Sequence, residues 1–214
     1  MSTKMERKSL TKIIGYFDEK ASLYGNTPEG SDYNSNNSQD VRITRLLSGF
    51  QTQNLGDIAD VGAGFGRARG LLSEQKFSFK YTGYEISEIP LLGAKKLFPD
   101  TSFKLIDSFN DVGFHDRIIL SGVFNIKLDT LDDTWEDYVF EAMQDLFLKA
   151  NCGIAVNFLS SYSDVEMRKD SLFYANPLKV FDFAKTNLSS HVKLDHAYGL
   201  WDFAIHIGKN VQSL

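Results

Sequence analysis

The chain has 214 residues, of which 43% are hydrophobic, and this length and composition suit one globular domain with a sizeable core. Its net charge of −5 argues against broad nucleic-acid binding, and no apolar run approaches the ~20 residues that cross a bilayer. The single cysteine, Cys152, leaves no disulfide framework, and residues 1–8 lack an apolar signal region. We therefore expect a cytoplasmic protein that binds neither nucleic acid nor membranes.

The first quarter of the chain carries two predicted helices. The first has apolar residues at helical spacing, namely Leu10, Ile13, Ile14, Phe17, Ala21 and Tyr24. The polar, turn-forming stretch 25–38 is predicted to be a loop. A second helix follows, with an apolar face of Ile43, Leu46, Leu47 and Phe50. We expect residues 1–50 to form a helical lid segment and residues 51–214 to form the body of the same domain.

Strand and helix patterns then alternate along the chain. Strands are predicted at 57–61, 79–84, 102–106, 116–121 and 153–159. Helices are predicted at 66–75, 87–97, 132–149 and 177–187. The chain ends with two further strands, 190–197 and 200–208, joined by a tight turn. This order predicts an α/β fold, in which helices cover both faces of a mostly parallel sheet.

The most informative motif lies at 58–66, where a short apolar strand runs into a turn with three glycines. Glycine lets the backbone approach a ligand closely, and the helix that follows directs its free N–H groups and positive dipole end at the same place. Such a turn is typical of a nucleotide-like cofactor site. In this chain the turn follows Asp60 and has glycine at 62, 64 and 66. Dinucleotide-binding turns have the pattern G-x-G-x-x-G, so their third glycine comes one residue later than Gly66 does here.

An acidic residue, Glu85, ends the second predicted strand, about 20 residues after the glycine turn. A carboxylate at this position accepts hydrogen bonds from both ribose hydroxyls and repels a 2′-phosphate, which disfavours NADP. NAD enzymes also have this acid, so Glu85 by itself leaves an NAD-dependent oxidoreductase open.

The turn from Asp60 to Gly66 resembles motif I of the class I S-adenosylmethionine (SAM)-dependent methyltransferases, and the order of elements with its terminal hairpin matches the same family. The resemblance spans about residues 10–208. It implies a Rossmann-like, doubly wound sheet of seven strands with an antiparallel last strand, and SAM as the cofactor. It places the methionine end of SAM in the turn formed by Asp60, Gly62, Gly64 and Gly66.

The same resemblance assigns the rest of the cofactor site. Glu85 would bind the ribose, and Ile86 would lie beside the adenine. Asp107 and Ser108, which follow the third predicted strand, would receive the adenine amino edge.

The fourth predicted strand ends in Ser121 and Gly122, whose backbone carbonyls would hold the ammonium of SAM. Asn125 follows and is a candidate for aligning the substrate. This segment lacks the (Asn/Asp)-Pro-Pro-(Tyr/Phe) signature of methyltransferases that act on DNA or on glutamine side chains, so those substrates are less favoured.

A second stretch, ahead of the glycine turn, is similar to a pattern in a subset of small bacterial methyltransferases that often accompany cell-surface polysaccharide genes. It consists of Tyr33, Ser35, Ser38, Gln39 and Arg42. The resemblance implies that Gln39 and Arg42 bind the methionine carboxylate, and that a sugar-linked or other small molecule accepts the methyl group, on oxygen. Many relatives have aspartate where this chain has Arg67, which leaves the electrostatics of the turn open.

Three tyrosines of the N-terminal region, Tyr16, Tyr24 and Tyr33, are candidates for a lid that encloses the substrate. The four histidines show no metal-ligand spacing, so we predict no metal. His196 alternates in phase with apolar neighbours and is expected in the core, and no residue is assigned as a base. A non-catalytic SAM-binding module stays open, whereas the glycine spacing and the hairpin disfavour the NAD-dependent oxidoreductase.

Overall fold

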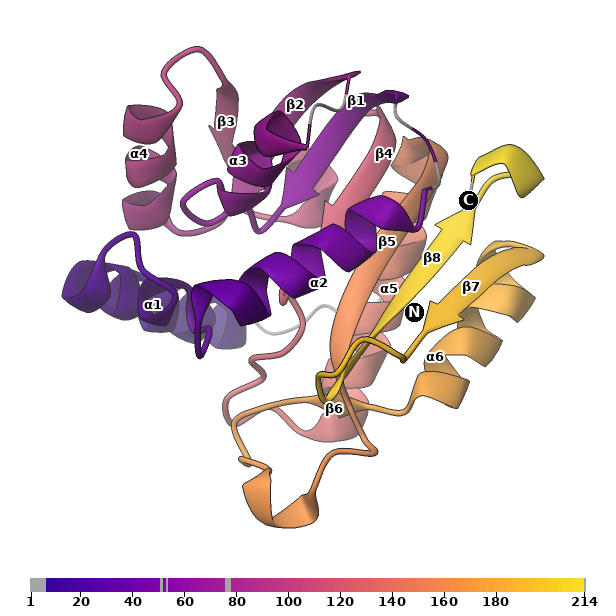
Figure 1. The fold of residues 1–214 in the computed structure, drawn as a ribbon. Coiled ribbons are helices and arrows are strands. Elements are labelled where there is room, and N and C mark those ends of the chain that lie inside the picture. The colour runs from indigo at the N-terminus through magenta and orange to yellow at the C-terminus, as the bar shows by residue number, and fades with distance from the viewer. Residues whose placement is uncertain (1–6, 51, 53, 76–77, 214) are drawn as a thin grey trace.

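A computed structural model describes residues 7–50, 52, 54–75 and 78–213 (Figure 1). Residues 1–6, which belong to the stretch expected to lack a signal region, lie outside the described residues. So does residue 51, the first residue of the expected body of the domain. Within the described part of the chain, no helix combines the length and the apolar character that a membrane crossing requires.

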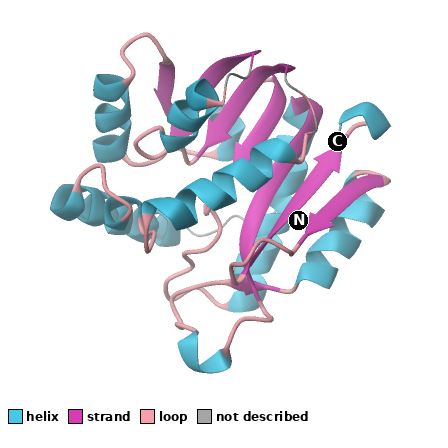
Figure 2. Cartoon of the chain, viewed as in Figure 1, coloured by secondary structure: helices cyan, strands magenta, loops and turns pink. Residues whose placement is uncertain are grey.

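One mixed sheet forms the centre of the molecule (Figure 2). Its parallel strands are β1 (Asn54–Val61), β2 (Ser78–Glu85), β3 (Ser102–Leu105), β4 (His115–Leu120) and β5 (Ala150–Ser160). The terminal hairpin consists of β7 (His191–Asp195) and β8 (Asp202–Gly208), with β8 antiparallel to β5. The strand order is β3-β2-β1-β4-β5-β8-β7. The predicted Rossmann-like fold with an antiparallel last strand is therefore confirmed.

The sheet contains one strand more than the seven that were predicted. The additional strand, β6 (Tyr174–Ala175), pairs with the last two residues of β5. Two residues are too short to produce an alternating pattern in the sequence. This strand forms because the chain returns past the carboxyl end of β5 before α6 begins.

Helices cover both faces of the sheet, as expected for a doubly wound fold. On one face lie α2 (Asn36–Ser48), α3 (Arg67–Glu74) and α4 (Glu88–Leu97), and on the other lie α5 (Asp132–Lys149) and α6 (Pro177–Phe183). The first helix, α1 (Arg7–Tyr24), lies beside α4 (Figure 1). Short helical turns occur at Glu29–Ser31, Phe109–Asp111, Val165–Met167, Ala184–Leu188 and Val211–Ser213.

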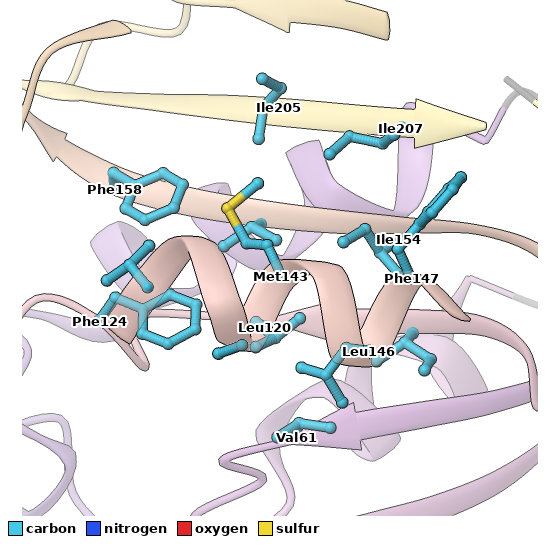
Figure 3. Packing of buried hydrophobic residues seen from close by; sticks show 14 of the residues in the cluster. Val61, Leu120, Phe124, Met143, Leu146, Phe147, Ile154, Phe158, Ile205 and Ile207 are labelled. Atoms are coloured by element: carbon cyan, nitrogen blue, oxygen red, sulfur yellow. The ribbon is translucent and has the colours of Figure 1, made fainter. Parts of the chain in front are cut away.

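The core beneath α5 follows from the apolar stripe of that helix. Met143 and Leu146 are fully buried and pack against Leu120 of β4 and Phe158 of β5 (Figure 3). Strands that are covered on both faces need continuous apolar runs rather than alternation, and the central strands have them. The elements that carry the site therefore stand on a rigid, close-packed base.

His206 of β8 is buried on the opposite face of the sheet. Its imidazole Nε2 lies 3.1 Å from the carbonyl oxygen of Arg45 near the end of α2, whereas its Nδ1 is buried without a partner. A Cβ at Gly49 would lie 1.9 Å from the same Nε2, so glycine lets α2 end directly on the ring. The expectation that His196 lies in the core is wrong, because its side chain is exposed and stacks on Tyr162.

We predict that His206 makes the protein less stable in mild acid. Burial lowers its pKa from the ordinary value of 6.5 to about 4, so between pH 4 and 6.5 the unfolded chain binds a proton at this residue and the folded chain does not. The free energy of unfolding should therefore fall as the pH drops from about 6.5 to about 4, by up to about 3 kcal/mol, and this contribution should level off below that window.

Urea unfolding of the wild type and of His206→Gln, measured across this pH range, checks the prediction. The comparison between two proteins is needed because buried Asp60, with a pKa raised to about 7, contributes a pH dependence of opposite sign. The two proteins should differ in slope between pH 4 and 6.5. Parallel stability curves would contradict the assignment.

Candidate functional site

The glycine turn lies at the carboxyl end of β1, where the strand order changes direction between β1 and β4. Gly62, Gly64 and Gly66 have φ values of 76°, 53° and 83°, which favour glycine. A Cβ at Gly62 would lie 2.6 Å from a methyl group of Val123. The backbone N–H of Gly62 donates to the carbonyl of Tyr84 at 2.8 Å. The predicted turn is therefore tight, and main chain rather than side chain lines it.

Glu85 faces this turn from the end of β2. Its carboxylate accepts hydrogen bonds from the backbone N–H groups of Gly64 at 2.7 Å, Ile86 at 2.8 Å and Ser87 at 3.0 Å. Burial raises the pKa of Glu85, and the three backbone donors oppose that rise. The acid predicted from its position in the sequence thus lies against the predicted turn.

Asp60 is buried beneath the turn and points into the fold. Its carboxyl group accepts a hydrogen bond of 2.6 Å from the Tyr81 hydroxyl. Burial raises the pKa of Asp60 to about 7, the Tyr81 hydrogen bond lowers it and the charge of Glu85 raises it further. These contacts make Asp60 a support for the turn rather than a group that touches a ligand directly.

A mostly apolar pocket opens beside Gly62. Residues from α1, from the segments at the ends of β1, β2, β3 and β4, and from α5 line it, namely Leu10, Ile13, Val61, Gly62, Ile86, Ile106, Asp107, Ser108, Phe109, Val123, Phe124, Trp135 and Tyr138. The structure therefore brings the predicted Ile86, Asp107 and Ser108 together at the turn. The backbone N–H of Ser108 donates to Asp111 at 3.0 Å, so it is not free to cap a ligand edge.

Several residues of this pocket were not predicted from the sequence. Trp135 and Tyr138 belong to the apolar stripe of α5, whose spacing indicates a core position rather than a pocket, and Phe109 lies in a short turn without a pattern. Val123, in contrast, directly follows the predicted Ser121 and Gly122, and its position after the end of β4 was a signal that could have identified it.

The end of β4 meets the N-terminal region through Tyr33. The Tyr33 hydroxyl lies 3.2 Å from both the carbonyl and the hydroxyl oxygen of Ser121. Gly122 has a φ of 74°, and a Cβ there would lie 2.6 Å from the Tyr33 hydroxyl. Ser35 caps the start of α2 by accepting a bond from Ser38 at 3.1 Å, and this cap fixes the loop that carries Tyr33.

The other two tyrosines do not reach the end of β4. Tyr16 packs edge-on against Phe17, and burial and the neighbouring Asp32 raise its pKa to about 12. Tyr24 is exposed at the end of α1, next to Lys20. The predicted substrate role for Tyr24 therefore has no support from its position, because the side chain faces solvent.

Arg42 has a different partner from the one expected. Its guanidinium donates two hydrogen bonds to Asp202 of β8, at 3.0 and 2.6 Å, and a third to the Ser38 carbonyl at 3.0 Å. This fork is already satisfied, so we no longer place Arg42 on a carboxylate ligand. Gln39 lies half-buried one turn earlier on α2.

Two further residues have contacts that their position in the sequence did not indicate. The side-chain oxygen of Asn125 accepts a hydrogen bond of 3.2 Å from the backbone N–H of Leu159, which ties the loop after β4 to β5. Arg67, the departure from the expected pattern, forms two bonds of 2.6 Å with Asp40. The Asp40 carboxylate therefore balances the positive charge at the third glycine. Among the described residues, no group of three His, Cys, Asp or Glu side chains is placed to hold a metal ion.

Comparison with known proteins identifies the family. No family model matches the chain. The chain is 32% identical, over 153 residues, to a protein of Mycobacterium tuberculosis named "Putative methyltransferase Rv1506c". The match covers 71% of this chain and 92% of that protein.

Solved structures show the same fold at low sequence identity. A DhpI–SAM–HEP complex matches with a TM-score of 0.66 and 13% identity, covering 92% of this chain and 96% of that one. Magnesium protoporphyrin IX methyltransferase from Synechocystis PCC 6803, with bound S-adenosylhomocysteine, matches with a TM-score of 0.64 and 12% identity over 94% and 100% of the two chains. With this fold, this relative and the glycine turn facing Glu85, the chain belongs to the class I SAM-dependent methyltransferase family.

Proposed function

We propose that this protein binds SAM at the carboxyl edge of its sheet and transfers the methyl group to an oxygen atom of a small, sugar-linked molecule. The observation that carries the proposal is the Glu85 carboxylate, held 2.7 Å from the backbone N–H of Gly64. A diol-binding acid, a side-chain-free turn and an apolar pocket therefore meet at one place. The acidic net charge of −5 favours a small acceptor over a nucleic acid.

The residues at this place fit the three parts of SAM. Ile86 and Val123 line the apolar pocket, which suits adenine, and Asp107 at its rim suits the adenine amino group. Glu85 suits the ribose diol. The amino-acid end then falls at the turn, where Gly66 directly precedes the eight-residue helix α3, whose positive end attracts a carboxylate.

The chemistry asks mainly for orientation. When bound, SAM supplies a methyl group activated by a sulfonium that leaves as a neutral thioether. Holding acceptor, methyl and sulfur in line can supply ~7–11 kcal/mol of the acceleration. The rigid end of β4, with Gly122 bonded to Asn157 at 2.8 Å, is suited to that task, and we assign no general base.

We further propose that residues 1–50 act as a lid over a body formed by residues 51–214. Leu10 and Ile13 of α1 form part of the pocket lining. Asp18 anchors α1 by accepting a 2.6 Å bond from the hydroxyl of Ser87, at the start of α4. A ligand in the pocket would thus lie beneath α1. The single cysteine suits a reducing compartment, so we place the activity in the cytoplasm.

Replacing Glu85 with alanine should weaken SAM binding by about 1–3 kcal/mol, because charge-assisted bonds to the ribose are lost. Calorimetry measures the change. Glu88→Ala removes an exposed carboxylate three residues away and should leave the affinity unchanged. Wild-type affinity in Glu85→Ala would show that the ribose lies elsewhere.

Incubation with methyl-labelled SAM and fractionated cell extract should label the small-molecule fraction and spare protein and nucleic acid. Within that fraction, we expect the label on a sugar-linked compound, in a bond that behaves as an ether or ester rather than as an amine. Labelling confined to protein or RNA would contradict the proposed acceptor class without affecting the SAM site.

SAM should also slow proteolysis of residues 25–38, which join α1 to the first turn of α2, because closure of α1 over the pocket restricts the segment that follows it. Limited digestion with and without SAM, followed by mass spectrometry, locates the cut. If the rate of cleavage in this loop is the same in both samples, the lid proposal is wrong.

A further inference from the structure

Four segments that lie far apart in the sequence meet around the end of β4. The Tyr33 hydroxyl contacts Ser121, and the Tyr33 ring lies 5.4 Å from the guanidinium of Arg42. Burial raises the pKa of Tyr33, so its hydroxyl stays protonated and available as a donor. The N-terminal segment therefore fixes the residue whose carbonyl we assign to the ammonium of SAM.

A second line of contacts leads from Gly122 through Asn157 to Asp202. Gly122 donates its N–H to the Asn157 side chain at 2.8 Å, and the other end of that amide donates to Asp202 at 3.4 Å. Asn157 and Asp202 are 0% and 1% exposed. The orientation of the Asn157 amide is thus set by Asp202, because a carboxylate can only accept a hydrogen bond.

Arg42 connects these two lines of contacts, because it touches both Asp202 and Tyr33. It binds Asp202 through two bonds, at 3.0 and 2.6 Å, and it stacks on Tyr33. A buried carboxylate needs such a partner, and the partner in turn holds the tyrosine. Asp202 is therefore the one group that both lines of contacts share.

We propose that Asp202 is a positioning residue for the amino-acid end of SAM, acting on Gly122 through Asn157 and on Ser121 through Arg42 and Tyr33. The inference rests on the proposed function, since it concerns the same cofactor. Asp202 lies at the start of β8, 80 residues beyond Gly122 in the sequence, and its buried carboxylate is occupied by Arg42 and Asn157. It should therefore affect only the part of the ligand that the end of β4 holds.

Two adenosine compounds separate this role from general stability. S-Adenosylhomocysteine has the amino-acid tail, whereas 5′-methylthioadenosine shares the adenine, the ribose and the thioether but lacks the tail. In Asp202→Asn, which keeps the side-chain volume and removes the charge, calorimetry should show about tenfold weaker binding of S-adenosylhomocysteine. Binding of 5′-methylthioadenosine should change by less than about twofold.

The chain offers a matched control in Asp195→Asn. Asp195 ends β7 and pairs with Arg45 of the same helix α2 at 3.6 Å, so the substitution removes a second, longer and more exposed ion pair between α2 and the hairpin, away from Gly122. It should leave the affinities for both compounds unchanged. Weaker binding of S-adenosylhomocysteine in this control would show that the ion pairs between α2 and the sheet affect binding only through the stability of the fold.

Tyr33→Phe tests the same contacts if Asp202→Asn does not fold, because it deletes only the hydroxyl that contacts Ser121. It should weaken the binding of S-adenosylhomocysteine by about threefold and leave the binding of 5′-methylthioadenosine unchanged. Equal losses for both compounds, or no loss for either, would overturn the inference while the proposed function stands. Failure of the wild type to bind S-adenosylhomocysteine would instead contradict the proposed function itself.

Discussion

The hydrogen bond between the Glu85 carboxylate and the backbone of Gly64 is the contact on which the site depends. It exists because β1 and β2 pair in parallel register, with Val61 opposite Tyr84, so both strands end at the same level. A buried carboxylate is costly unless it accepts several donors, and Glu85 accepts three backbone N–H groups. The same bonds that stabilise the acid fix the shape of the turn.

Polar contacts rather than apolar packing alone attach the N-terminal region to this centre. Asp18 meets the start of α4, Asp40 meets Arg67 at the turn, and Arg42 meets Asp202 of β8. Such contacts have defined geometry, so they set the position of α1 and α2 over the site more narrowly than a sliding apolar surface would. The same polar contacts of α1 and α2 therefore both cover the pocket and hold the residues around the glycine turn and the end of β4 in place.

Much of the fold was predictable because its signals are local. Helix α5 occupies the predicted residues 132–149, and the parallel strands begin and end within a few residues of their predicted limits. Their spacing in the sequence predicted that the glycines at 62, 64 and 66 and the acid at 85 lie at the ends of neighbouring strands, because spacing indicates where a strand ends. Residues placed by a turn or a strand end were thus recognisable one by one.

By itself, the sequence determined the order of elements, the glycine turn and the acid that faces it, because each follows from neighbours within one strand or turn. Only the tertiary structure decided the partners of long polar side chains. Arg42 binds Asp202, which is 160 residues away, and no local pattern encodes that distance. His196 differs from expectation for the same reason: its surroundings come from segments that the fold, not the adjacent sequence, brings to it.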